Sequence, residues 1–174
     1  SPNLMGIQCH TGWLSPAGQM AFYDEMSEAG IPISITEFWA NINELKNQPQ
    51  KAVESEEWRS FGGNKKHEDL SESELEEIRD KYILDYLTIA FAHPNIHSFY
   101  FWGLMGTAVK FENPYNSSHE MQPIFYKLKD LIHNQWKTKT SLITDKNGKI
   151  NFRGFCGEYA LKIKPENGPA VGYR

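Results

Sequence analysis

The sequence predicts an α/β fold in which parallel strands form a sheet that helices cover. Two observations favour this class. Short β-prone runs alternate with longer runs of helical periodicity, and glycine and proline residues separate them. No apolar run reaches the roughly 18 residues of a membrane-spanning helix. Alternating strands and helices place successive strands side by side and parallel, so we expect three such units followed by a β-hairpin.

The first unit combines a strand over residues 4–9 with a helix over residues 16–29. The strand is short and mostly apolar. The helix has a clear beginning and end, because Ser15 suits the N-cap, Pro16 suits the first helical position and Gly30 suits the stop. Its apolar side chains recur at helical spacing, which predicts that one face of the helix packs on the sheet.

The second strand covers residues 31–36 and is rich in β-branched side chains, which favour strands. Residues 41–69 follow as a long polar loop with several glycine and proline residues. A short helix over residues 53–58 is an alternative within this loop. The loop separates the strand from its helix by more residues than most connections use.

The helix that follows has the clearest pattern in the chain. Ser71 and Glu74 match a capping box, apolar residues then recur at steps of three and four, and the pattern stops before Pro94. A strand over residues 96–105 and a helix over residues 123–136 make the third unit.

The C-terminal region contains a turn signal, Asn147-Gly148, between two alternating runs. Such a dipeptide is typical of a two-residue hairpin turn, so a hairpin is predicted over residues 144–163. Residues 165–174 are rich in glycine and proline and are expected to be a frayed tail.

The composition is ordinary for a globular protein. The 174 residues are 40% apolar and 23% charged, and the net charge of −4 gives no sign of nucleic-acid binding. Five tryptophans suit either a flat ligand surface or core packing. Cys9 and Cys156 form neither a disulfide framework nor a metal-ligand spacing. Whether these two cysteines pair stays open.

Three residues of chemical interest, His10, Glu37 and Trp102, fall at the carboxyl ends of the predicted strands. An ionised carboxylate is almost never buried without a partner, so Glu37 either reaches water or serves a task. In βα barrels the functional residues gather at this end of the strands. The residues by themselves leave plainer alternatives open, which are a solvated carboxylate, a core histidine and a core tryptophan.

Several segments resemble glycoside hydrolase family 10, the retaining xylanases. GIQCH (6–10) resembles the Gln-x-His motif of the sixth strand of that family, and GIPISITEF (30–38) resembles the Thr-Glu motif of its seventh strand. AFAHPNIHSFYFWGLM (90–105) is similar to the segment that enters the eighth strand. The order and spacing of these motifs, with the closing QPIFYKLKDLIHNQWKT (122–138), extend the resemblance over most of the chain.

The resemblance implies the C-terminal portion of a (β/α)8 TIM barrel, about strands six to eight, over residues 1–138. Residues 139–174 would then be an appended β-hairpin and tail that pack on the barrel. The implied activity is hydrolysis of xylan or a related β-1,4-glycan by retaining double displacement. A polysaccharide or oligosaccharide substrate, no cofactor, no nucleic-acid or membrane partner, and a secreted protein follow from the same resemblance.

The resemblance also assigns roles to single residues. Glu37 matches the catalytic nucleophile, and His10 matches the histidine that holds this carboxylate by a hydrogen bond. Gln8, Trp39 and Trp102 are the expected substrate-binding residues, since an indole ring suits the apolar face of a sugar.

A retaining enzyme also needs an acid/base carboxyl group about 5 to 5.5 Å from the nucleophile. In the family this group follows an Asn on the fourth strand, whereas this sequence begins at the sixth-strand motif. We therefore expect the chain alone to hydrolyse xylan poorly. Asn43-Glu44 lies only a loop away from Glu37, so we do not expect Glu44 to be the acid.

Two other functions stay open at this point. One is a non-catalytic carbohydrate-binding or scaffold derivative of the same fold. The other is a half-barrel that associates with a second copy, because an open edge of a parallel sheet favours pairing with another strand. The oligomeric state is not fixed by the sequence.

Overall fold

The computed structural model describes residues 3–10, 14–40, 69–103, 114–116 and 118–173. The predicted loop over 41–69, with its possible helix and with Glu44, lies outside the described residues. The chain divides into two compact units, Ser1–Lys129 and Asp130–Arg174. The predicted division after residue 138 stays a prediction, and the two units are described separately below.

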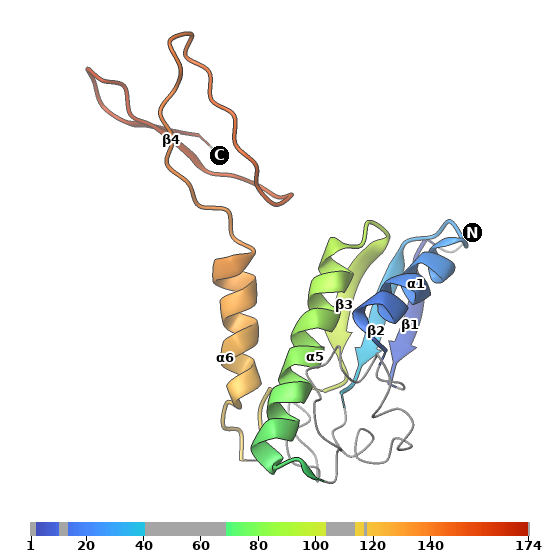
Figure 1. Ribbon diagram of the computed structural model, residues 1–174. Coiled ribbons are helices and arrows are strands. Elements are labelled where there is room, and N and C mark those ends of the chain that lie inside the picture. The colour runs from blue at the N-terminus through green and yellow to red at the C-terminus, as the bar shows by residue number, and fades with distance from the viewer. Residues whose placement is uncertain (1–2, 11–13, 41–68, 104–113, 117, 174) are drawn as a thin grey trace. The chain divides into compact units, whose positions relative to one another are not determined.

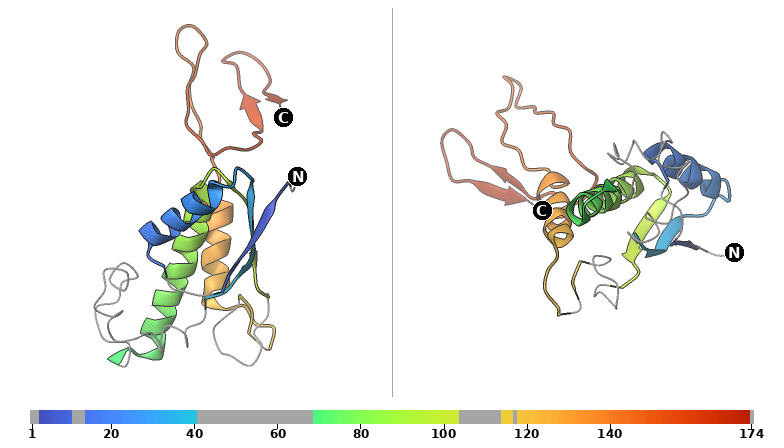
Figure 2. Two further views of the ribbon diagram at one scale, coloured as in Figure 1. Left: turned by 90° about the vertical axis from the view of Figure 1, so that its right-hand side faces the viewer. Right: turned by 60° about the horizontal axis from the view of Figure 1, so that its bottom comes forward.

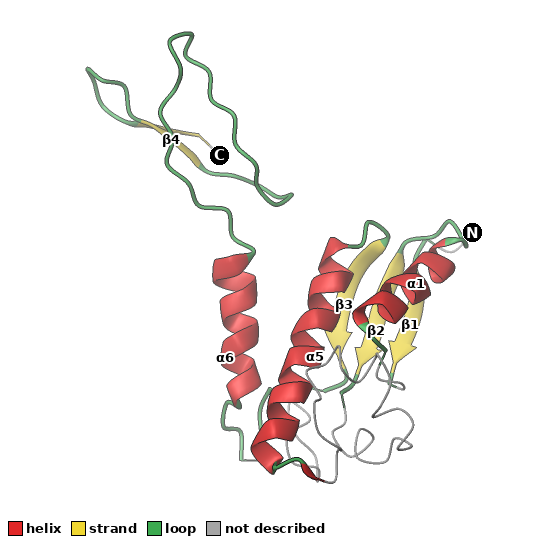
Figure 3. Ribbon diagram, in the orientation of Figure 1, coloured by secondary structure: helices red, strands yellow, loops and turns green. Residues whose placement is uncertain are grey.

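The first unit contains a three-stranded parallel sheet of order β1-β2-β3, formed by Met5–Cys9, Ile33–Phe38 and Ile96–Phe101. Helices α1 (Pro16–Ser27) and α5 (Glu72–Ala92) connect the strands (Figures 1 and 3). Both helices cover the same face of the sheet (Figure 2). The predicted α/β class with a parallel sheet is confirmed. The three described strands form an open sheet and not a closed barrel.

The helix ends follow the capping signals of the sequence. The Ser15 hydroxyl accepts a bond from the backbone N–H of Gly18 at 3.1 Å, and Pro16 begins α1 as expected. Ser71 and Glu74 form both bonds of the capping box at the start of α5. A cap of this kind satisfies backbone donors that the first turn of a helix leaves open.

The core of the first unit is an aromatic cluster between the sheet and α5. Phe38 of β2 is 2% exposed, and its ring centroid lies 4.5 Å from that of Tyr86 and 6.0 Å from that of Tyr82. Phe99 and Phe101 of β3 contact the same ring of Phe38 from the neighbouring strand. Rings at these separations fill the interior and add pairwise attraction to their burial.

A buried ion pair on one helix of this unit also contacts a lysine of a second helix. Arg79 and Asp80 of α5 are 1% and 2% exposed, and the Arg79 Nε donates to Asp80 Oδ1 at 2.9 Å. Lys127, on helix α6 (Pro123–Asp130), donates to the other carboxylate oxygen of Asp80 at 2.9 Å. Buried charges of this kind require partners, and Asp80 has two: the buried Arg79 on its own helix and the partly exposed Lys127 on α6.

Between Ile35 and Phe38, strand β2 contains one residue more than either neighbour has over the same interval. Along β1 the register pairs Ile7 with Ile35, Gln8 with Glu37 and Cys9 with Phe38. Along β3 it pairs Ile35 with Phe99 and Phe38 with Phe101, so β2 takes three steps where β3 takes two. Both neighbours therefore place a β-bulge at the same point of β2, opposite Thr36. Bulges are rare between parallel strands.

The limits of β2 differ from the prediction. The sequence predicts a strand that ends at Thr36, whereas β2 runs to Phe38 and contains Glu37. The reason is the aromatic core, because Phe38 pairs with Cys9 and packs on α5 and so extends the ladder by two residues.

The second unit opens with a π-helical turn, η2 (Leu131–Gln135), and contains two short antiparallel strands, β4 (Leu161–Ile163) and β5 (Val171–Tyr173). The predicted hairpin over 144–163 is wrong in its position. A turn forms at Asn147-Gly148, but Asp145 closes it by accepting the backbone N–H groups of residues 147 and 149 at 2.8 Å. The strand that pairs with β4 comes from the segment expected to be a frayed tail.

Among the described residues, no helix combines the length and apolar character that a membrane crossing requires.

The aromatic core predicts a large effect of truncating Phe38. Phe38→Ala should lower the free energy of unfolding by about 3 to 5 kcal/mol, because the removed ring leaves a cavity lined by Tyr82, Tyr86 and Phe99. Urea unfolding followed by circular dichroism measures the change. Tyr100→Ala is the control, since Tyr100 is 58% exposed and its loss should cost only about 0.5 kcal/mol. Equal losses for both variants would contradict this description of the core.

Candidate active site

The candidate site lies at the carboxyl ends of the three parallel strands. His10 follows β1, Glu37 lies near the end of β2, and Trp102 follows β3. The strand ends are held beside one another by backbone bonds: the N–H of Trp39 donates to the carbonyl of Cys9 at 3.1 Å, and the N–H of Trp102 donates to that of Phe38 at 2.8 Å. A rigid sheet edge of this kind positions side chains with precision.

The register determines which way these side chains face. Paired residues of neighbouring strands point to the same side of a sheet, and residues alternate along each strand. Cys9 and Phe38 are paired and face α5, so Gln8 and Glu37, the pair before them, face the opposite side. His10 lies two residues after Gln8 and shares that side. The bulge is needed for this result, because an uninterrupted strand would place Glu37 on the same side as Ile35.

His10 and Glu37 are in direct contact. The His10 Nε2 lies 2.6 Å from Glu37 Oε2, and the side chains are 31% and 23% exposed. In either the neutral tautomer with a proton on Nε2 or the charged form, the ring donates this bond to the carboxylate. The bond fixes one carboxylate oxygen, while partial exposure leaves the group open to a ligand.

Two indole rings flank the imidazole. The ring centroid of His10 lies 6.3 Å from that of Trp39 at an interplanar angle of 33°, and 5.6 Å from that of Trp102 in an edge-on arrangement of 66°. Trp102 is 49% exposed. A half-exposed indole beside a carboxylate offers an apolar surface to a flat ligand.

The structure thus brings four of the predicted site residues together, since Trp39 and Trp102 contact the ring of His10 and His10 contacts Glu37. Gln8, the fifth, is exposed, is paired with Glu37 in the register and faces the same side. The arrangement supplies a held carboxylate, a polar amide and aromatic surfaces. Three further aromatic residues, Trp13, Trp58 and Phe111, lie outside the described residues.

A hydrogen-bonded network lies behind the site, on the helix side of the sheet. The Tyr86 hydroxyl bonds to the Cys9 thiol and to Tyr23, and the Gln19 amide donates to the Tyr23 hydroxyl at 3.1 Å and to the Tyr86 carbonyl at 2.9 Å. Burial raises the pKa of Cys9, and it raises the pKa of Tyr23 and Tyr86 as well. These groups are therefore neutral at physiological pH and serve as packing and hydrogen-bonding partners.

Tyr86 contacts the neighbours of both central site residues. It bonds to Cys9, which precedes His10, and its ring packs on Phe38, which follows Glu37. In the sequence, Tyr86 is simply one of the residues that recur at helical spacing after the capping box of Ser71 and Glu74. The alternation of side chains along a strand could have indicated these contacts. Cys9 and Phe38 are the neighbours of His10 and Glu37, so they face the opposite side of the sheet, where the helix lies.

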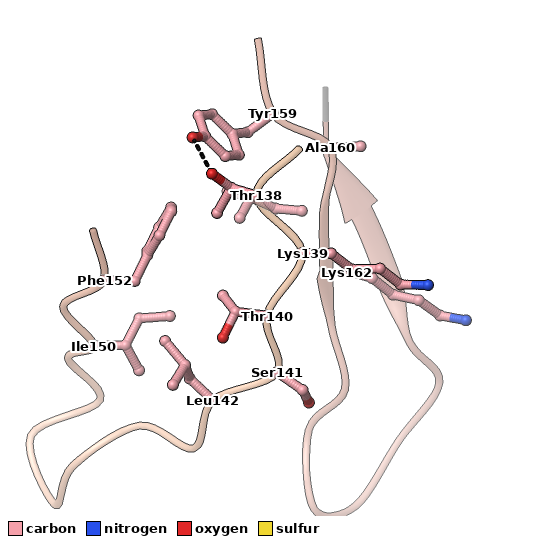
Figure 4. Close-up of a pocket in the computed structure, with 11 residues that line it drawn as sticks. Thr138, Lys139, Thr140, Ser141, Leu142, Ile150, Phe152, Tyr159, Ala160 and Lys162 are labelled. Atoms are coloured by element: carbon pink, nitrogen blue, oxygen red, sulfur yellow. Dashed lines mark hydrogen bonds between the residues drawn. The ribbon is translucent and has the colours of Figure 1, made fainter. Parts of the chain in front are cut away.

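The second unit holds a cavity of about 240 Å³, which Leu142, Ile150, Phe152 and Tyr159 line together with several threonine and lysine residues. Figure 4 shows the Tyr159 hydroxyl bonded to that of Thr138, at 3.2 Å, and the chains of Lys139 and Lys162 directed away from the cavity. No carboxylate lines this cavity. Its lining does not supply the acid–base chemistry that Glu37 and His10 offer.

In the described part of the chain, no group of three or more histidine, cysteine, aspartate or glutamate residues is placed to hold a metal ion.

Comparisons with known proteins bear on the fold. No family model and no curated protein matches the sequence. Among solved structures, xylanase 10B from Thermotoga petrophila RKU-1 in complex with xylobiose is similar, with a TM-score of 0.51, 14% sequence identity and coverage of 76% of this chain. The chain spans 37% of the length of that xylanase. At this identity the likeness shows a shared fold, that of part of a glycoside hydrolase.

The environments of the two cysteines predict different reactivities. Both are free thiols; Cys156 is exposed, while burial raises the pKa of Cys9. The thiolate is the reactive form, and a raised pKa lowers its fraction at any pH below that pKa. Iodoacetamide at pH 8 should therefore modify Cys9 about tenfold more slowly than Cys156, as measured by mass spectrometry of peptides. Equal rates would contradict the buried position of Cys9, and labelling that requires prior reduction would show that the two cysteines pair.

Proposed function

We propose that the protein is a glycoside hydrolase that cleaves xylan or a related β-1,4-glycan by the retaining double-displacement mechanism. The observation that carries the proposal is the 2.6 Å contact between His10 and Glu37 at the carboxyl ends of parallel strands. The fold shared with a xylanase that was crystallised with xylobiose supports the substrate class. An extracellular location belongs to the same proposal, since such polysaccharides lie outside cells.

Glu37 is the proposed nucleophile. In this mechanism an ionised carboxylate attacks the anomeric carbon, the leaving oxygen takes a proton from a second carboxyl group, and water then cleaves the glycosyl-enzyme. A carboxylate held at one oxygen by His10 keeps its other oxygen free for attack. The bond from His10 also holds the carboxylate in one orientation, as a nucleophile that attacks from a fixed direction requires.

The other residues are proposed to bind the sugar. Trp102 presents a half-exposed indole, and Trp39 supplies a second ring near His10, so a pyranose placed over Glu37 would meet apolar surfaces. Gln8 faces the same side and supplies an amide for sugar hydroxyls. The proton-donating carboxyl group is proposed to come from a segment other than the three described strands.

Covalent labelling tests the nucleophile without the proton donor. A 2,4-dinitrophenyl 2-deoxy-2-fluoro-β-xylobioside carries a leaving group so acidic that it departs without protonation, and its fluorine slows hydrolysis of the glycosyl-enzyme. The protein should gain one fluoroxylobiosyl group, found on the peptide that contains Glu37. Glu37→Gln should abolish labelling, because an amide does not attack the anomeric carbon.

The matched control is Glu120→Gln, since Glu120 is an exposed carboxylate that accepts a bond from Asn116 and lies outside the site. This variant should be labelled like the unchanged protein. Labelling of a residue other than Glu37 would overturn its role. Binding of xylo-oligosaccharide without any labelling would favour the non-catalytic carbohydrate-binding alternative.

Removing the exposed indole should weaken sugar binding. Trp102→Ala should lower the affinity for xylotetraose about tenfold, because a stacked ring is worth on the order of 1 kcal/mol beyond its burial. Calorimetric titration of the Glu37→Gln protein, which cannot turn the sugar over, measures the change. Tyr126→Ala is the control, since Tyr126 is 58% exposed on α6. An unchanged affinity in Trp102→Ala would remove this ring from the binding surface.

A further inference from the structure

The bulge in β2 decides where Glu37 points, so the contacts that hold the bulge bear on the site. Ile7 and Ile35 form the last regular pair before it, and Gln8 and Glu37 form the first pair after it. Thr36 lies opposite the interval between these pairs. A bulge interrupts the hydrogen-bond ladder and leaves local backbone groups in need of other partners.

The Thr36 hydroxyl supplies such a partner. Its Oγ1 donates to the backbone carbonyl of Ile7 at 3.0 Å, which bridges β1 and β2 at the interval itself. A β-branched side chain has few rotamers, so the hydroxyl is held in this direction. The side chain thus occupies the place of a ladder bond that the extra residue displaces.

Gly6 completes the arrangement from the other strand. A Cβ atom added at Gly6 would lie 3.0 Å from the Thr36 Cγ2, closer than nearly all contacts of this kind. The methyl group of Thr36 therefore lies over Gly6, and any larger residue at position 6 would push Thr36 away from the carbonyl of Ile7. These two contacts are independent observations that fix one side chain.

We infer that Thr36 is a positioning residue for Glu37, and that Gly6 provides the space it requires. The hydroxyl holds the extra residue of β2 in place, and the bulge in turn directs the Glu37 carboxylate to His10 while Phe38 remains in the core. The expected effect of Thr36 on the rate of attack by Glu37 rests on the proposed function. The expected effect of Thr36 on the contact between Glu37 and His10 does not.

Histidine ring spectra test the geometric consequence. Long-range ¹H–¹⁵N spectra report the state of both ring nitrogens through carbon-bound protons, and His10→Gln identifies the signals of His10. In Thr36→Val, which keeps the shape and removes the hydroxyl, these signals should shift toward those seen in Glu37→Gln. Thr36→Ser retains the hydroxyl and should restore the signals of the unchanged protein. Gly6→Ala should resemble Thr36→Val.

Thr88→Val is the matched control, because Thr88 on α5 also donates its hydroxyl to a backbone carbonyl, that of Leu84 at 2.7 Å. It should leave the His10 signals unchanged. Signals of His10 that are unaltered in both Thr36→Val and Gly6→Ala would overturn the inference, as would a shift in Thr36→Ser as large as that in Thr36→Val. Circular dichroism establishes whether each variant is folded. If Thr36→Val is not folded, the His10 signals of Gly6→Ala test the inference instead.

Covalent labelling provides the kinetic arm. The rate at which the fluoroxylobioside labels Glu37 should fall about 100-fold in Thr36→Val, the effect expected of a displacement near 1 Å, and should be restored in Thr36→Ser. If the unchanged protein is not labelled, the proposed function fails, and the ring spectra still decide the role of Thr36. If it is labelled and Thr36→Val keeps the same rate, the positioning role fails while the proposed function stands.

Discussion

The structure depends on one extra residue in the central strand. Between Ile35 and Phe38, β2 has one residue more than both neighbours have over the same interval. This residue allows Glu37 to lie in the site while Phe38 lies in the core. Phe38 enters the aromatic core beneath Tyr86, and Glu37 turns to the open side where His10 meets it. The hydrophobic core and the charged contact are thus two results of one backbone irregularity. Bulges are recurrent beside functional sites for this reason.

The architecture of the first unit follows closely from local sequence signals. Ser15, Pro16, Ser71 and Glu74 predict the helix ends because capping depends on a few adjacent residues, and the α/β class follows from the alternation of periodicities. The second unit shows the limit of that reasoning. Asn147-Gly148 does form a turn, yet the choice of partner strand depends on residues 171–173, which carry only a weak local signal.

The sequence likewise predicts some features of the site and not others. The position of His10, Glu37 and Trp102 at strand ends could be read from the sequence, because parallel strands bring their carboxyl ends to one edge. The direction of Glu37 could not be read in the same way, since strict alternation would place it beside Ile35. The bulge that redirects it comes from pairing with two neighbouring strands. Thr36 and Tyr86 were overlooked because their contacts, to Ile7 and to Cys9, are tertiary.

The irregular register of β2 also bears on how such a chain tolerates change in length. Loss of the Thr36 codon would leave Glu37 as the single residue between Ile35 and Phe38. The pairing with Gln8 and Cys9 would then be regular, and plain alternation would keep the carboxylate on the open side and the ring in the core. The placement would invert only if every residue were kept and the bulge were straightened, because the carboxylate would then face the apolar interior and the ring would face solvent. A chain shorter by this one residue could therefore keep both side chains in place, whereas a further inserted residue would need a second irregularity to do so.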